Sequence, residues 1–198
     1  MESTPLNILF AISAGVALAA ATGFRAFLPL FGLGLVARLG WTTIRPAEQW
    51  LAGDLALIAL GTATVVELLA DKIPVVDHVL DSIATVIRPV AAWVVSFGVL
   101  TPLGQEWAGA LATVLAGGAF GVHALKAKAR VGSTLATVGT ANPFLSAIED
   151  AIALTLTLVG ILAPILALLF LVLLVWVGIK VLRKVSRTPP AGDNRLRA

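Results

Sequence analysis

The residues that could do chemistry are concentrated in positions 65–89 of this 198-residue chain. This stretch carries seven ionisable side chains, namely Glu67, Asp71, Lys72, Asp77, His78, Asp81 and Arg88. Most of the remaining chain is apolar, and an ionisable side chain near or inside a hydrocarbon layer is costly and usually has a function. The stretch is therefore the first place where we expect a functional site.

The carboxylates are spaced so that pairs of them share a helical face. Glu67 and Asp71 lie four residues apart, and Asp77 and Asp81 repeat this spacing. If the helices that carry them meet a later acidic pair at one end of the molecule, up to six carboxylates converge. We predict an ion-binding site made of Glu67, Asp71, Asp77, Asp81, Glu149 and Asp150.

Two kinds of chemistry and one structural role fit these residues. An oxygen-rich cluster suits a bound divalent cation such as Ca²⁺, Mg²⁺ or Mn²⁺, and the same groups suit a proton-relay path. The candidate metal ligands are Glu67, Asp71, Asp81 and Asp150. The predicted counter-charges or proton-relay groups are Arg25, Lys72, Arg88 and His123. Alternatively, the carboxylates complement helix dipoles in first turns, and the cations form ordinary structural ion pairs.

The composition predicts that these residues are held by membrane helices. Hydrophobic residues make up 59% of the chain and charged residues 13%, and the mean hydropathy is +0.98, outside the range of soluble domains. No charged residue lies between Glu2 and Arg25, or between Asp150 and Lys180. Either run is long enough to cross a hydrocarbon core of about 30 Å. We therefore expect an all-α, polytopic membrane helical bundle.

Charge and motifs exclude several classes of protein. The basic residues stand at the ends of apolar runs, as in membrane proteins, and not in a patch that would bind nucleic acid. The absence of cysteine excludes disulfides and thiolate metal sites. The chain has no glycine-rich phosphate loop and no G-x-S-x-G elbow, so we do not expect an enzyme. We predict one transmembrane domain over 1–187 and a disordered cytoplasmic tail over 188–198.

The apolar runs predict about six crossings with kinked or broken helices. The first run, 7–39, is too long for one upright crossing and contains Gly23 and Pro29, so a kink or a break is expected between residues 22 and 29. The other crossings are predicted over 55–70, 74–101, 108–125 and, split near 160–164, over 147–179.

Two basic clusters predict the orientation. Residues 126–130 and 180–187 are the most basic segments, and such segments stay on the cytoplasmic side. An even number of crossings between them is then required, and both termini are expected to be cytoplasmic, in a bacterial inner membrane. The expected partners are the lipid bilayer and a second copy in a homo-oligomer. Small residues of the crossing 108–125, such as Gly117, Gly118 and Gly121, are expected to let neighbouring helices approach closely.

The chain also contains two internal similarities. Residues 19–27 (AAATGFRAF) resemble 117–125 (GGAFGVHAL), which pairs Arg25 with His123. Residues 74–84 resemble 143–153, at a different offset. With three crossings before the second copy, the two halves would have opposite orientations, which predicts a 3+3 inverted repeat of the kind found in many transporters.

Four segments resemble a known family. These are GFRAFLPL (23–30), VELLADKIPVVDHVLD (66–81), IRPVA (87–91) and NPFLSAIED (142–150). Together they are similar to a family of bacterial and plastid membrane proteins called domain of unknown function 4126. The resemblance covers most of the chain and implies a small polytopic membrane protein without an established activity.

A looser similarity concerns residues 67–72. They are similar to the Glu-x-Gly-Asp-Lys motif of small inverted-repeat cation exchangers, but here the motif has one extra residue and lacks the glycine. The extra residue rotates the aspartate by about a quarter turn relative to the glutamate.

These observations predict a small membrane transporter or channel for a cation or a proton-coupled small solute. Glu67 and Asp71 would form its core site. One alternative is a non-transporting scaffold or accessory subunit that packs against partner helices. Another is a lipid-handling protein in which Arg25 or Arg88 meets a phosphate headgroup.

Overall fold

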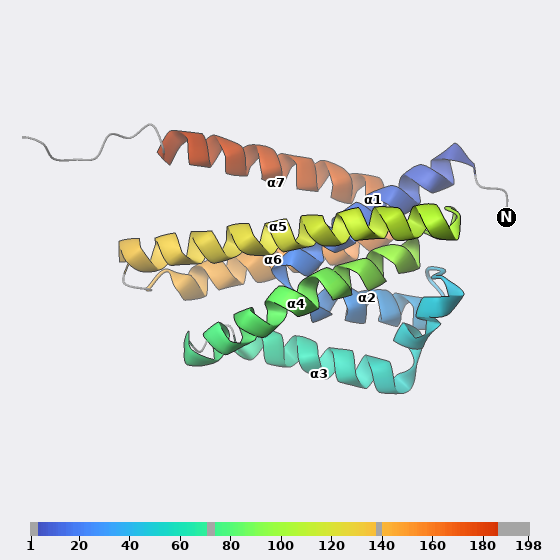
Figure 1. Cartoon of the computed structure of the whole chain (residues 1–198), viewed down its shortest axis with the longest axis horizontal. Coiled ribbons are helices and arrows are strands. Elements are labelled where there is room, and N and C mark those ends of the chain that lie inside the picture. The colour runs from blue at the N-terminus through green and yellow to red at the C-terminus, as the bar shows by residue number, and fades with distance from the viewer. Residues whose placement is uncertain (1–3, 71–73, 138–139, 186–198) are drawn as a thin grey trace, which may run out of the picture.

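The computed structural model describes residues 4–70, 74–137 and 140–185, without the side chains of 74–82, 181, 182, 184 and 185. This part of the chain forms seven α-helices and one short 3-10 helix, so the predicted all-helical bundle is confirmed (Figure 1). The helices are α1 (Pro5–Phe24), α2 (Phe27–Arg38), α3 (Asp54–Ala70), α4 (Pro74–Val99), α5 (Gln105–Thr137), α6 (Asn142–Leu162) and α7 (Pro164–Val185), and the 3-10 helix is η1 (Pro46–Ala52).

Helix α1 is the centre of the bundle. It contacts α4, α5, α6 and α7, and its buried residues are alanines, glycines, Ser13 and Thr22 with one larger side chain, Leu18. Small residues let the backbones of neighbouring membrane helices approach closely. This central position follows from the composition of α1, because its buried side chains other than Leu18 are small and let the surrounding helices approach.

The predicted break in the run 7–39 is confirmed, and it is complete. Arg25 is extended, with φ −138° and ψ 116°, and its N–H donates to the carbonyl of Ala21 as the last bond of α1. Helix α2 then turns back along the bundle, so Asn7 in the first turn of α1 and Thr43 after the end of α2 line the same cavity. One predicted crossing is therefore two antiparallel helices.

This reversal changes the direction of every later helix. The bundle alternates from α1 to α7, so that α1 begins at one end and α7 ends at the other (Figure 1). The sequence analysis expected an even number of crossings and both termini on one side. The arrangement of the helices differs from this expectation because the chain reverses direction at Arg25, whereas a kinked helix would continue in the same direction.

The packing of α1 against α5 shows the relative direction of these two helices. Ala11 clusters with Ala112, and Ala19 with Ala119, so the two helices run in the same direction. The matched segments 19–27 and 117–125 therefore lie parallel, whereas an inverted repeat needs opposite orientations. The repeat prediction failed at this point because it treated α1 and α2 as one crossing.

Among the described residues, three helices, α1, α5 and α6, are long and apolar enough to cross a membrane. Helix η1 and α3 together would make a fourth span, bent by 66°. The predicted split of 147–179 is confirmed, since α6 ends at Leu162 and α7 begins at Pro164. The length and composition of these helices are thus compatible with a membrane protein.

Helix α5 differs from its prediction. From the sequence we expected this crossing to end at residue 125 and the basic cluster 126–130 to lie on the cytoplasmic side. The structure continues the helix to Thr137 and buries Lys126 and Arg130. Lysine, arginine and alanine are good helix formers, so the local sequence permits the continuation, and burial of the charges depends on partners elsewhere in the chain.

Candidate functional site

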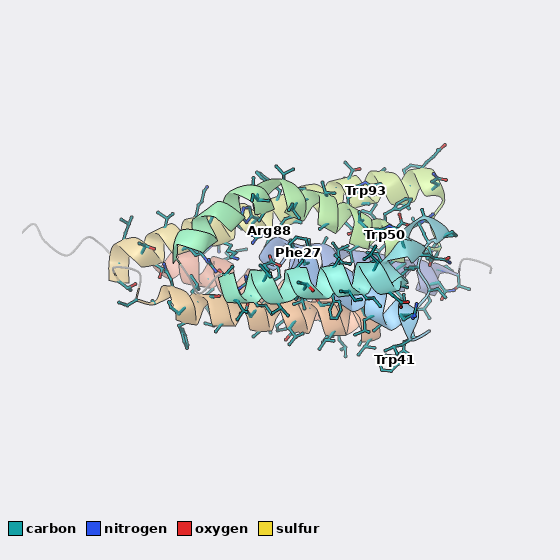
Figure 2. The ribbon with its side chains drawn as sticks, turned by 90° about the horizontal axis from the view of Figure 1, so that it is seen from below. Phe27, Trp41, Trp50, Arg88 and Trp93 are labelled. Atoms are coloured by element: carbon teal, nitrogen blue, oxygen red, sulfur yellow. The ribbon has the colours of Figure 1, made fainter. Side chains whose placement is uncertain are left out.

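Ionisable side chains from five parts of the chain meet where α1 gives way to α2. We call this set the buried ionic network, and it consists of Arg25 at the break, Glu67 on α3, Arg88 on α4, His123, Lys126 and Arg130 on α5, and Glu149 and Asp150 on α6. Six of the eight residues are buried, and the two exceptions, Glu67 and Asp150, are partly exposed. Figure 2 places Arg88 and Phe27 near the middle of the length of the bundle.

Glu67 holds the start of α2. Its Oε1 accepts a hydrogen bond of 2.9 Å from the N–H of Ala26, and its Oε2 accepts one of 3.2 Å from the N–H of Phe27. The first turn of a helix leaves backbone N–H groups without helical partners, and a negative charge is favourable there. Ala26 has no side chain that could cap α2, and Pro29 lacks an N–H. A carboxylate from α3 therefore does the capping.

Arg25 ties the break to α6 and α3. Its guanidinium forms an ion pair with Asp150 and donates a hydrogen bond of 3.2 Å to Oγ of Ser146. It also lies 3.4 Å from the backbone carbonyl oxygen of Glu67, to which it donates. The side chain is 1% exposed, so it is desolvated and depends on these partners. The sequence analysis identified Arg25 but gave no signal for Ser146.

Arg88 connects Glu67 with His123. One guanidinium nitrogen contacts Nδ1 of His123 and lies 3.4 Å from the carbonyl oxygen of Gly23, and the other lies 3.7 Å from the carboxylate of Glu67. The remaining ring nitrogen, Nε2, is 3.2 Å from Oγ1 of Thr85. A guanidinium can only donate, so Nδ1 accepts and the ring proton is assigned to Nε2. In this arrangement His123 is neutral.

Glu149 is the partner of the two buried cations of α5. Its Oε2 lies 3.1 Å from Lys126 and 2.7 Å from Arg130. Lys126 also donates a hydrogen bond of 3.4 Å to the carbonyl of Phe24, at the end of α1. The spacing of His123, Lys126 and Arg130 places all three on one face of a helix. That spacing was the signal that could have found Lys126 and Arg130 in the sequence.

The family model for domain of unknown function DUF4126 matches residues 12–184, a span that contains the whole buried ionic network. The chain belongs to the DUF4126 family. No curated protein and no solved structure matches it. The site of this DUF4126 protein must therefore be interpreted from its own geometry.

The structure brings together six of the sequence-predicted residues of this DUF4126 protein, namely Glu67, Glu149, Asp150, Arg25, Arg88 and His123. Asp71 and Lys72 lie outside the described residues. Asp77, His78 and Asp81 belong to the first half of α4, whose side chains are not described. Within the described part of the chain, no group of three or more histidines and carboxylates is placed to hold a metal ion.

The ion pairs of the buried ionic network could respond to protonation. Each described carboxylate of the network contacts an arginine or a lysine. In a medium of low dielectric constant, removing one partner of such a pair leaves a charge that is strongly destabilised. A proton that neutralises one carboxylate would therefore break a pair and release its cation, which is the kind of event that moves helices.

Proposed function

We propose that the protein is a small membrane transporter that couples solute movement to protons through the buried ionic network. The observation that carries the proposal is the convergence of these charges on a complete helix break in the middle of a membrane-type bundle. Discontinuous helices near the bilayer midplane form the substrate and ion sites of many transporters. Ionisable residues at that depth mark ion or proton paths. The proposed location is a bacterial inner membrane.

Protons fit the described part of the site better than a bare metal cation. A metal ion would need several carboxylate oxygens, but Glu149 already contacts Lys126 and Arg130, and Asp150 contacts Arg25. A proton needs no ligand set, because it binds to one carboxylate or to one histidine nitrogen. This favours proton coupling over the bound divalent cation that the sequence also allowed.

The test is solute-driven proton movement in proteoliposomes. The full chain is reconstituted with a pH-sensitive dye inside, and a panel of amino acids, sugars, small carboxylates, amines and metal cations is added outside, one class at a time. We expect one class to change the internal pH, and we expect Glu67→Gln to abolish this change.

Asp54→Asn is the matched control for that experiment. Asp54 is on the same helix as Glu67 but is exposed, and it pairs with the exposed Arg38. The control should transport like the unaltered protein. If no class of solute moves protons above the rate of protein-free vesicles, or if Glu67→Gln transports normally, the proposal is wrong.

A second candidate function is a non-transporting scaffold. The observation that favours it is the open face of α5. Apart from the adjoining residues and backbone of the same helix, no described heavy atom lies within 4 Å of a Cβ built at Gly117, Gly118 or Gly121. The sequence analysis expected these glycines to serve close helix packing, and within the described residues they do not. They would be free to contact a partner helix or a second copy. This function would be favoured by a partner protein that copurifies with the unaltered chain and with Glu67→Gln but no longer copurifies with Gly118→Leu.

A lipid-handling role gains no support from the arginines. Both Arg25 and Arg88 contact protein groups inside the bundle.

A further inference from the structure

We propose that the start of α2 and Arg88 form an anion seat for a small carboxylate, which Glu67 occupies in this structure and leaves when it is protonated. The anion seat consists of the N–H groups of Ala26 and Phe27 and the guanidinium of Arg88. The proposal rests on the proposed transport function and specifies its substrate class. It depends on three donors from two helices together with the carboxylate that they already hold.

The seat is built into the core of the bundle. Ala26 is 1% exposed and Arg88 2% exposed. Gly23, just before the break, is packed so tightly against α5 that an added Cβ would lie 2.6 Å from Cβ of Val122. Arg25 anchors the same segment to Asp150 of α6. These contacts hold the segment that carries the donors in addition to the capping by Glu67.

The carboxylate that occupies the seat is carried by a peripheral helix. Among the described residues of α3, only Thr64 and Ala70 are buried, and Val65, Val66 and Leu69 are exposed. Figure 1 shows α3 on the outer side of the bundle, and Figure 2 shows it crossing the face turned to the viewer. A shift of α3 would therefore disturb far less packing than a shift of α1. The donors of the seat are buried in the bundle, whereas the carboxylate that occupies it is carried by a helix whose residues are mostly exposed or half-buried.

The geometry selects a carboxylate. The two oxygens of Glu67 each accept from one of two consecutive backbone N–H groups, at 2.9 and 3.2 Å, as a planar two-oxygen anion does. Arg88 lies 3.7 Å from the same group, which is within ion-pair range but too long for a hydrogen bond. A free carboxylate, without the tether of a side chain, can approach the guanidinium more closely and form charge-assisted hydrogen bonds.

The exchange conserves charge. A proton binds to the carboxylate of Glu67 and makes it neutral, and the incoming carboxylate brings the negative charge that Glu67 has lost. The seat therefore holds one negative charge before and after the exchange. One proton accompanies one anion, which is the stoichiometry expected of an electroneutral symporter.

The test is equilibrium binding of radiolabelled acetate to the purified full chain in detergent, at about pH 5.5 and about pH 7.5. The unaltered protein should bind acetate more tightly at the lower pH. Glu67→Gln should bind equally well at both pH values and about tenfold or more tightly than the unaltered protein at the higher pH, because the competing charge is gone. Arg88→Gln should bind about tenfold or more weakly.

Asp54→Asn again serves as the control and should bind like the unaltered protein. If Glu67→Gln does not fold, Glu67→Asp replaces it, because the shorter side chain keeps the charge but cannot reach both N–H groups, and it should also bind more tightly at the higher pH. The anion seat is wrong if acetate binding by the unaltered protein does not depend on pH, or if neither Glu67→Gln nor Glu67→Asp binds acetate. Displacement by inorganic phosphate at lower concentration than by acetate overturns the carboxylate assignment.

The outcomes separate this proposal from the transport function. Proton movement driven by an amine, a sugar or a metal cation, with no acetate binding, overturns the anion seat and leaves the transport function standing. Acetate binding as described, with no solute-driven proton movement, supports the seat and overturns transport.

Discussion

Two helix breaks in the described part of the chain fall within long apolar runs, and their surroundings differ. The break between α1 and α2 is at Arg25, which is buried and surrounded by charged groups. The break between α6 and α7 is at Ala163, in a segment, 160–166, that has no charged residue. There the N–H of Ala163 donates to Val159 and Pro164 begins the next helix without an N–H of its own.

The surroundings of the two breaks determine how much free energy their unpaired backbone groups cost. Pro164 lines an open cavity of about 1010 Å³ at the end of the bundle, together with Asn7, Thr43 and Arg45. Backbone groups there have polar neighbours and space for water, and proline removes one donor outright. The break at Arg25 lies deep among packed helices, where unpaired backbone groups are expensive. It therefore needs Glu67, and Glu67 and Arg25 in turn need counter-charges.

The charges at the deep break thus have a structural role as well as the proposed functional one. Removing them should harm folding, whereas matched changes at the second break should not. The strength of this contrast can be measured.

The largest expected effect is that of Arg25→Ala. The change leaves Asp150 and the hydroxyl of Ser146 without their cation inside the bundle, and breaking a buried ion pair costs about 3–5 kcal/mol. The free energy of unfolding is measured by titration with SDS in mixed micelles. Arg38→Ala is the control, because its pair with Asp54 is exposed and should contribute about 0–1 kcal/mol. Equal stability of the two variants would show that the deep break does not depend on Arg25.

The next effect compares two glycines near the two breaks. Gly23→Ala places a Cβ 2.6 Å from Cβ of Val122 and 2.8 Å from the carbonyl oxygen of Ala119, and such overpacking costs about 1–3 kcal/mol. Gly160→Ala places a Cβ 3.1 Å from Cβ of Ala17, which a small shift relieves, so we expect a loss of about 1 kcal/mol or less. Both are measured by the same titration. A larger loss for Gly160→Ala would contradict the view that the first break is the more tightly held.

The smallest effect is expected from Pro164→Ala. Alanine adds a backbone N–H that can reach the open cavity, and it also makes the unfolded chain more flexible, so the loss should be about 0.4–1 kcal/mol. Size-exclusion chromatography after heating gives the midpoint of unfolding. A collapse of the protein in this variant would mean that the second break is also a fixed structural element.

Much of the fold could be read from local sequence. Gly23 and Pro29 predicted the first break, Pro74 the start of α4, and Pro164 the split between α6 and α7, because proline and glycine act on the backbone of their own neighbourhood. The acidic and basic residues of 65–89 indicated where charge enters the bundle. Three of the predicted carboxylates, Glu67, Glu149 and Asp150, are indeed in the network.

The rest required the packing. Lys126 and Arg130 were expected in a basic cluster on the cytoplasmic side, because a charged residue is assigned to water unless a partner is known. Their partner Glu149 comes from the next helix. A kink and a full reversal at Arg25 are equally compatible with the local sequence, yet they give the bundle a different number of crossings.

By itself, the sequence determined the helical class, most of the helix breaks, the apolar character and the kinds of charge available, since these depend on residues close together in the chain. Only the tertiary structure decided which charges pair. The N–H of Ala26 meets Glu67 across 41 positions, and Arg25 meets Ser146 across 121. Such contacts exist only because small residues on α1 let the other helices pack around it, and no local rule encodes them.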